Sequence, residues 1–251
     1  MEERTYKIHD EPGFIYREFV TGGRFQRHMG IISVTQEDGL YWLGRYTERV
    51  YTTIRLYAKY YDEMIEHDDF YIQFCQRMEI PNIYSSGEDF IKRYGYDKEN
   101  PDSLISNMYR AYDNAVTLRE LIRSSALSYV QLAVYAMNRA AQSQAPLLEL
   151  QKVCDYIVAF WGIIDDSISV NQVRDLIKTG RRLERVDLYA RMRYEEGEMR
   201  EAIRRLTSYR LARSGLACSK ARIANLEKYK KDNILDYDDI VFQVEHIFDD
   251  D

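Results

Sequence analysis

Apolar residues recur every three or four positions along most of this chain, which is the spacing of one face of an α-helix. A first stripe follows Thr35, whose side chain can cap a helix, and predicts a long helix from there to about Asp62. This stripe consists of Leu40, Leu43, Val50, Ile54 and Tyr57. Its spacing, and the absence of long stretches of strict apolar and polar alternation, favour helix over strand.

The remaining sequence predicts further helices, separated by the few residues that interrupt helical backbone. Pro81, Gly87, Gly95 and Pro101 divide the region from about 67 to 101 into short helices and loops. Beyond it, helical spacing predicts elements over 102–142, from Pro146 onward, and over 171–194, 198–211, 215–231 and 236–248. The predicted fold class is therefore all-α, a multi-helix bundle.

The chain is long enough for one domain with a sizeable core, since it has 251 residues of which 45 % are hydrophobic. Residues 1–28 are expected to form an N-terminal extension, because Met29 to Ser33 has the pattern that opens a bundle. No linker rich in serine and glycine divides the rest of the chain. Residues 29–251 are thus predicted to form a single helical bundle domain.

Composition narrows the class of protein. Three widely spaced cysteines without a CxxC pair suggest neither a disulfide framework nor a zinc site. No stretch has the ~18 uncharged apolar residues of a membrane span, and no apolar leader is present, so we expect a cytoplasmic protein. A net charge of −6 argues against a general nucleic-acid binder. Nucleic-acid binding by the arginines between 200 and 213 therefore ranks last among the alternatives.

One charged heptad occurs twice, at positions 44–50 and 180–186, with the constant offset of 136 residues that separates Gly44 from Gly180. Both copies read Gly-Arg-x-x-Glu-Arg-Val. On the same helix face as the second copy's charges lie Ile177, Leu188 and Met192, and apolar side chains at these positions indicate that this face is buried. We therefore expect two pseudo-symmetric central helices that carry the repeated Gly-Arg-x-x-Glu-Arg motif in the interior.

Buried charges need close partners, because removing an ion from water carries a desolvation penalty on the order of several kcal/mol. A neighbour on the same helix points ~100° away, so the pairs should form between the helices. We expect Glu48 to pair with Arg181 or Arg185. By the same argument, Glu184 should pair with Arg45 or Arg49, and the motif glycines should let the two backbones approach.

These six side chains, the Arg/Glu seam, contain two glutamates and four arginines, a surplus of positive charge. Guanidinium groups bind carboxylates and phosphates bidentately, so the surplus indicates an anionic ligand. The sequence leaves open the alternative that nearby acids complete a purely structural network. These acids are Asp113, Asp165, Asp166 and Asp187.

Other chemistry is less well represented. The four histidines form no Glu-x-x-His pair, so no metal site is predicted. No phosphate-cradling glycine loop or Walker lysine occurs, so no intrinsic cofactor is expected, and any ATP and Mg²⁺ would be bound by a partner.

The residues from Tyr41 to Arg49 resemble the opening signature of the bacterial alpha-E domain family, an α-helical domain with a Glu-Arg motif. The residues from Thr179 to Asp187 are similar to that family's second signature, Leu-Gly-Arg-x-Leu-Glu-Arg-Ala-Asp. A middle motif is matched in part, at Asn114, Ala115 and Arg119. It departs from the family pattern at Val116, Arg123 and Ser125.

The resemblance implies an accessory to circularly permuted ATP-grasp ligases and transglutaminase-like proteins, acting in the formation or modification of amide bonds on small peptides. We expect a helical component of such a system that holds an anionic peptide or acyl phosphate in the seam. Five arginines would grip the anion beside Tyr41 and Asn114, and Glu48 and Glu184 would orient them or accept a proton from an attacking amine. These arginines are Arg45, Arg49, Arg119, Arg181 and Arg185.

Two questions stay open on the sequence. Whether the chain is itself an enzyme, a subunit of an ATP-dependent amide ligase or an accessory is not decided, and neither is self-association into a homo-oligomer. The rival hypothesis is a non-catalytic scaffold or interaction protein, in which the same ion pairs are structural and specify helix register.

Overall fold

The computed structural model describes residues 32–66, 69–231 and 234–249, and the regular elements in these ranges are α-helices. The all-α prediction is therefore confirmed; the predicted extension, residues 1–28, lies outside the described residues. The helices are α1 (Val34–Glu66), α2 (Asp69–Met78), α3 (Gly87–Tyr96), α4 (Leu104–Thr117), α5 (Arg119–Ala140), α6 (Pro146–Ser167), α7 (Asn171–Arg191), α8 (Glu196–Leu206), α9 (Tyr209–Arg213), α10 (Lys220–Lys228) and α11 (Tyr237–Glu245).

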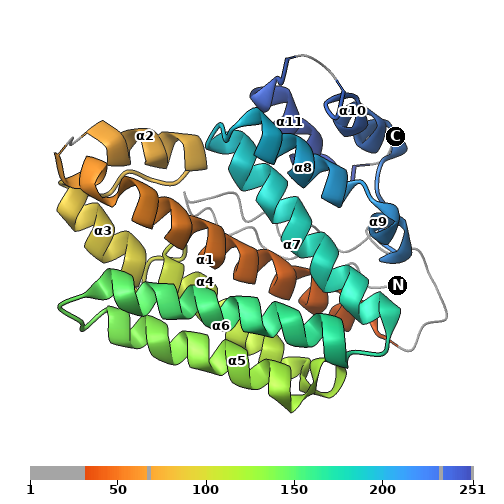
Figure 1. Cartoon of the computed structure of the whole chain (residues 1–251), viewed down its shortest axis with the longest axis horizontal. Helices are drawn as coiled ribbons and strands as arrows, with labels where there is room; N and C mark the ends of the chain where they lie inside the picture. The colour runs from red at the N-terminus through yellow and green to blue at the C-terminus, as the bar shows by residue number, and fades with distance from the viewer. Residues whose placement is uncertain (1–31, 67–68, 232–233, 250–251) are drawn as a thin grey trace, which may run out of the picture.

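Two helices form the centre of the bundle, α1 and α7, and they cross each other in Figure 1. Helices α4 and α6 also pack on α1, and α5 forms an antiparallel pair with α6. Helices α8, α9 and α11 pack on α7. The predicted stripe of α1 is buried in the core, and Leu40, Leu43 and Val50 have no exposed surface.

Helix α1 begins close to its predicted start, but a different residue caps it. The backbone N–H of Gln36 donates to Ser33 Oγ at 3.2 Å, and the backbone N–H of Ser33 donates to Gln36 Oε1 at 2.9 Å. This reciprocal pair is a capping box that satisfies two otherwise unpaired backbone donors. The cap is therefore Ser33, and the prediction of Thr35 was wrong by two residues.

The single helix predicted over 102–142 is wrong, since the chain changes direction between α4 and α5. Leu118 has non-helical backbone angles (φ −97°, ψ 10°), and its side chain is buried against Gly39 of α1. Within α5, Arg123 has a positive φ of 69° and interrupts the helical backbone a second time. Burial of Leu118 in the core favours this break, and neither proline nor glycine marks it in the sequence.

The helix predicted over 198–211 is also divided, into α8 and α9, at Ser208. The guanidinium of Arg182 in α7 donates to the carbonyl oxygen of Arg205 and to Ser208 Oγ, both at 2.9 Å. A side chain from another helix thus caps the carbonyl end of α8. The next predicted helix, over 215–231, begins only at Lys220, where Ser219 Oγ accepts from the backbone N–H of Arg222 at 3.1 Å.

The three cysteines are free thiols, and burial raises the pKa of each to about 12. They are therefore uncharged at neutral pH and poor nucleophiles. Among the described residues, no helix is both long enough and apolar enough to cross a membrane.

Candidate functional site

The two central helices touch at the glycines of the repeated motif. A methyl group on Gly44 would lie 2.0 Å from the carbonyl oxygen of Ile177, and one on Gly180 would lie 2.0 Å from the carbonyl oxygen of Tyr41. Ile177 and Tyr41 each stand three residues before a motif glycine, so approximate two-fold symmetry relates the two contacts. Any side chain larger than hydrogen would push the helices apart.

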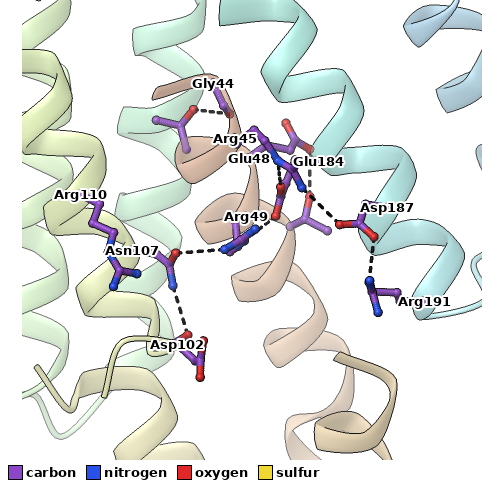
Figure 2. A network of polar contacts seen from close by, with 12 residues as sticks. Gly44, Arg45, Glu48, Arg49, Asp102, Asn107, Arg110, Glu184, Asp187 and Arg191 are labelled. Atoms are coloured by element: carbon purple, nitrogen blue, oxygen red, sulfur yellow. Dashed lines mark hydrogen bonds and ion pairs between the residues drawn. The ribbon is translucent and has the colours of Figure 1, made fainter. Parts of the chain in front are cut away.

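The motif charges pair across this crossing, as expected from the sequence. Glu48 accepts hydrogen bonds from Arg181 Nε at 2.9 Å and from Arg185 Nε at 2.6 Å. Glu184 accepts in the same way from the Nε atoms of Arg45 and Arg49. Figure 2 shows the second set between the two helices. Each glutamate therefore bridges two arginines of the other helix.

The two glutamates are buried completely, with 0 % of each side chain exposed. Burial by itself would raise the pKa of Glu184, but the charges and hydrogen bonds of Arg45 and Arg49 outweigh it, so the pKa lies below the usual value. Such pairs compensate the desolvation of both ions only while all partners are present.

One half of the seam, formed by Arg45, Arg49 and Glu184, is closed by further protein groups. Arg45 donates to a second carboxylate, Asp187 at 3.3 Å, and to the hydroxyl of Tyr41 at 3.1 Å. Asp187 also accepts from Arg191 at 2.8 Å. Although burial alone would lower the pKa of Arg45, its anionic neighbours raise it. In this closed half, protein acids therefore take the contacts that a bound anion would otherwise make.

The other half, formed by Arg181, Arg185 and Glu48, lacks the second carboxylate. The position related to Asp187 by the offset of 136 is Tyr51, whose phenol does not replace a carboxylate. Arg181 instead stacks on the ring of Trp161, with 3.4 Å between its Cζ atom and the ring centroid. Burial and the charge of Arg185 lower the pKa of Arg181 despite its pairing with Glu48. This is the open half.

Without that second carboxylate, the arginines of the open half keep hydrogen-bond donors available. In the part of the chain that the structure describes, Arg181 and Arg185 pair with Glu48 through Nε, and their terminal nitrogens donate to no protein acceptor. Arg181 is 24 % exposed, compared with 12 % for its counterpart Arg45. An anion can therefore reach the open half but finds its place taken in the closed half.

Both open-half arginines line a cavity of about 440 Å³ between α7, α8 and α9, which we call the basic pocket. Seven basic residues and one acidic residue line it. The basic residues are Lys178, Arg181, Arg182, Arg185, Arg204, Arg205 and Arg210, and the acidic residue is Asp165.

Charge repulsion is visible inside the basic pocket. Burial lowers the pKa of Arg182 to about 10, and repulsion by Arg210, Arg181 and Arg205 contributes. Burial also lowers the pKa of Lys178, although it pairs with Asp165. A bound anion would relieve both effects, because it compensates the desolvated cations.

The structure does not bring every expected residue to the seam. Arg119 is 65 % exposed and pairs with its neighbour Glu120 at 3.1 Å, outside the seam. Asn114 is half-buried on α4, and another asparagine of that helix, Asn107, accepts from Arg49 at 3.5 Å. The expectation that Arg119 grips the same anion is therefore not supported, because its exposed side chain pairs with Glu120 and not with a seam residue.

Sequence reasoning also missed most of the basic pocket. The density of arginine from 174 to 213 was the available signal. Some of these arginines do form ion pairs along one helix, since Glu201 accepts from Arg204 and Arg205, which lower its pKa to about 2. Helical spacing alone does not show that α7 and the end of α8 line one cavity. Among the described residues, no group of three or more histidines, cysteines and acids is placed to hold a metal ion.

Comparison with known proteins bears on identity. No curated protein and no solved structure matches this chain. Residues 36–232 match the model of the Alpha-E family, described as a predicted α-helical domain with a conserved ER motif. The matched region spans more than three quarters of the chain and contains both Glu-Arg pairs of the seam, Glu48-Arg49 and Glu184-Arg185. The protein belongs to the Alpha-E family.

Proposed function

We propose that the protein binds an anionic ligand, a peptide that bears a carboxylate or a phosphate, through Arg181 and Arg185. The observation that carries this proposal is the asymmetry of the seam. The two charge clusters have the same two arginines around one glutamate, but Asp187 completes the closed half, whereas Tyr51 leaves the open half one carboxylate short. The ligand supplies the missing anion.

The open half is well prepared to bind. Glu48 holds the Nε atoms of both arginines, and Trp161 supports the guanidinium plane of Arg181. Arginines that are already ordered lose little conformational entropy when a ligand arrives. The pair can thus offer bidentate donors to a carboxylate or phosphate at low cost.

In this proposal the glutamates orient arginines. Both oxygens of Glu48 accept hydrogen bonds, from Arg181, Arg185 and Thr52, and the side chain is inaccessible. A carboxylate in this setting holds its partners in place, while a proton acceptor must reach the proton it removes. The chemical step then belongs to a partner protein.

We propose a circularly permuted ATP-grasp ligase as that partner, which would bind ATP and Mg²⁺ and form or modify an amide bond on the held peptide. A transglutaminase-like protein is the second expected partner. The support for both is the resemblance of the two motif signatures to alpha-E domains, together with a pocket suited to an anionic substrate.

The rival function, a non-catalytic scaffold, is favoured by one observation. The closed half has all the contacts of a structural network, since Asp187 links Arg45 to Arg191, which also pairs with Glu79 and Glu245. These pairs join α7 to α1 and α11. A scaffold would need nothing further, so the two functions differ in whether the open half binds an anion.

Thermal unfolding with added anions separates them. Inorganic phosphate or succinate, at constant ionic strength, should raise the Tm of the wild-type protein, because a ligand at 100 times its Kd adds about 2.7 kcal/mol to stability. Arg181→Gln should abolish the shift and Arg181→Lys should keep part of it. Arg119→Gln, an equal charge change outside the seam, should leave the shift unchanged.

The outcomes are decisive in both directions. If neither anion raises the Tm of the wild-type protein, or if Arg181→Gln retains the full shift, the seam binds no ligand and the scaffold function is correct.

The ligase partnership has its own test: a purified ATP-grasp partner should form amide bonds faster with the wild-type protein than with Arg181→Gln. Equal rates would refute the partnership.

A further inference from the structure

The basic pocket carries more positive charge than a single carboxylate can neutralise. Five of the lining cations form ion pairs with three carboxylates. Glu48 pairs with Arg181 and Arg185, Glu201 pairs with Arg204 and Arg205, and Asp165 pairs with Lys178. The buried Asp175 is shared between Arg210 and Arg213. With Arg213 included, eight cations share these four carboxylates, so four positive charges are uncompensated.

These charges come from different elements and surround the cavity. Lys178, Arg181, Arg182 and Arg185 lie on α7 at helical spacing, and Arg204 and Arg205 lie at the end of α8. Arg210 extends the lining onto α9. A ligand in the pocket would therefore meet cations from more than one side.

The walls of the basic pocket are held in place by polar contacts. Arg182 fixes the turn between α8 and α9 through the Arg205 carbonyl oxygen and Ser208 Oγ, and Asp175 anchors α9 to α7 through Arg210 at 3.2 Å. A pocket that is already assembled gains affinity, because its side chains lose little freedom on binding.

We infer that the basic pocket takes an oligophosphate, with one phosphate at Arg181 and Arg185 and the next phosphates at Arg204 and Arg205. This inference rests on the proposed function in one respect, that Arg181 and Arg185 bind an anion, and it names linked phosphates as that anion in place of a peptide carboxylate. Both a free oligophosphate and the phosphate arm of a nucleotide have this chemistry. No bond is made or broken in the binding step.

Phosphate fits the charge and the volume better than carboxylate does. A phosphate monoester carries nearly two negative charges and three acceptor oxygens in one small group, about −1.5 to −2 at neutral pH. Linked phosphates place three or four charges within a few ångströms of each other, as the clustered arginines require. A peptide needs a separate residue for each carboxylate, and several such residues would crowd a cavity of about 440 Å³.

Affinity as a function of phosphate chain length tests the inference. Calorimetric titration of the full chain with orthophosphate, pyrophosphate and tripolyphosphate, in Mg²⁺-free buffer at constant ionic strength, should show Kd falling at least tenfold from the first to the last. The double variant Arg204→Gln/Arg205→Gln should weaken tripolyphosphate at least tenfold and change orthophosphate less than twofold. Both side chains are more than half exposed, so the variant should fold.

A matched control removes two charges elsewhere. Arg119 and Arg193 are 65 % and 57 % exposed and lie outside the pocket lining, so Arg119→Gln/Arg193→Gln should bind all three phosphates as the wild-type protein does. ATP and ADP form a second arm. Tighter binding of ATP than of tripolyphosphate indicates a nucleotide, equal binding indicates a free oligophosphate, and both results support the inference.

Equal Kd values for the three phosphates in the wild-type protein would overturn the inference and leave the proposed function intact. So would tripolyphosphate binding that is unchanged in Arg204→Gln/Arg205→Gln. If the wild-type protein binds none of the phosphates and no carboxylate, the proposed function fails as well.

Discussion

Replacing Gly44 with alanine adds one methyl group at the point where the two central helices touch. That methyl would lie 2.0 Å from the carbonyl oxygen of Ile177 and 2.9 Å from the backbone nitrogen of Arg181. Both atoms belong to the backbone of α7, so no flexible side chain can move aside. The helices must separate or the mutated helix must bend.

The size of the effect depends on two opposing contributions. In an exposed helix, glycine to alanine stabilises by about 1 kcal/mol. At Gly44, ordinary contact begins near 3.4 Å, so the backbones must separate by about 1.4 Å, a large shift for a close-packed interior. Overpacking of this kind costs typically about 1–3 kcal/mol, and stretching the ion pairs of Glu48 and Glu184 adds to it. We expect a net loss of about 2–4 kcal/mol.

Urea unfolding followed by far-UV circular dichroism measures this change in the free energy of unfolding. Gly162→Ala is the matched control, because Gly162 is exposed within α6 and has no atom within 4 Å of the added methyl. The control should be as stable as the wild-type protein or up to about 1 kcal/mol more stable. Gly180→Ala should behave as Gly44→Ala does, because symmetry relates the two contacts.

A thermal melt gives a second measure. With about 2–4 °C of Tm for each kcal/mol in a chain of this size, Gly44→Ala should lower Tm by roughly 4–16 °C. If Gly44→Ala is as stable as Gly162→Ala, the helices do not touch at the motif glycine, and the geometry of the seam as described is incorrect.

Three further changes test the seam. Glu48→Gln should lower the free energy of unfolding by about 3–5 kcal/mol in urea unfolding, because it removes a fully buried carboxylate and leaves the half-buried Arg181 and Arg185 without their anion; a loss under about 1 kcal/mol would contradict this. Glu184 has a lower pKa in the folded than in the unfolded chain, so its contribution to the free energy of unfolding is complete above pH 4.5 and is lost as pH falls below that value. Glu184→Gln should therefore reduce the loss of stability with falling pH, measured by urea unfolding at several pH values. An unchanged loss would contradict the lowered pKa of Glu184. Tyr51→Asp supplies the carboxylate that the open half lacks, so the Tm shift caused by phosphate should fall, and an undiminished shift would count against the symmetry argument.

Much of the fold can be predicted from local patterns. The three-to-four-residue apolar spacing predicts α1 and α7 close to their observed bounds and the start of α6 at Pro146, because each helix has regularly spaced apolar residues in the core. The positions where α4 meets α5 and α8 meets α9 could not be predicted. They depend on the burial of Leu118 against α1 and on a hydrogen bond from Arg182, contacts between residues far apart in the sequence.

The Arg/Glu seam was also predictable only in part. The sequence by itself determined that two helices carry matching charges and that each glutamate pairs across the crossing, because a buried carboxylate requires a cation and the duplicated motif offers a symmetric one. Only the tertiary structure decided that Asp187 closes one half while Tyr51 leaves the other open. Helical spacing predicts which side chains share one face of a helix. Which face borders a cavity depends on how α8 and α9 pack on α7. That packing is set by contacts between residues far apart in the sequence, so local spacing cannot predict it.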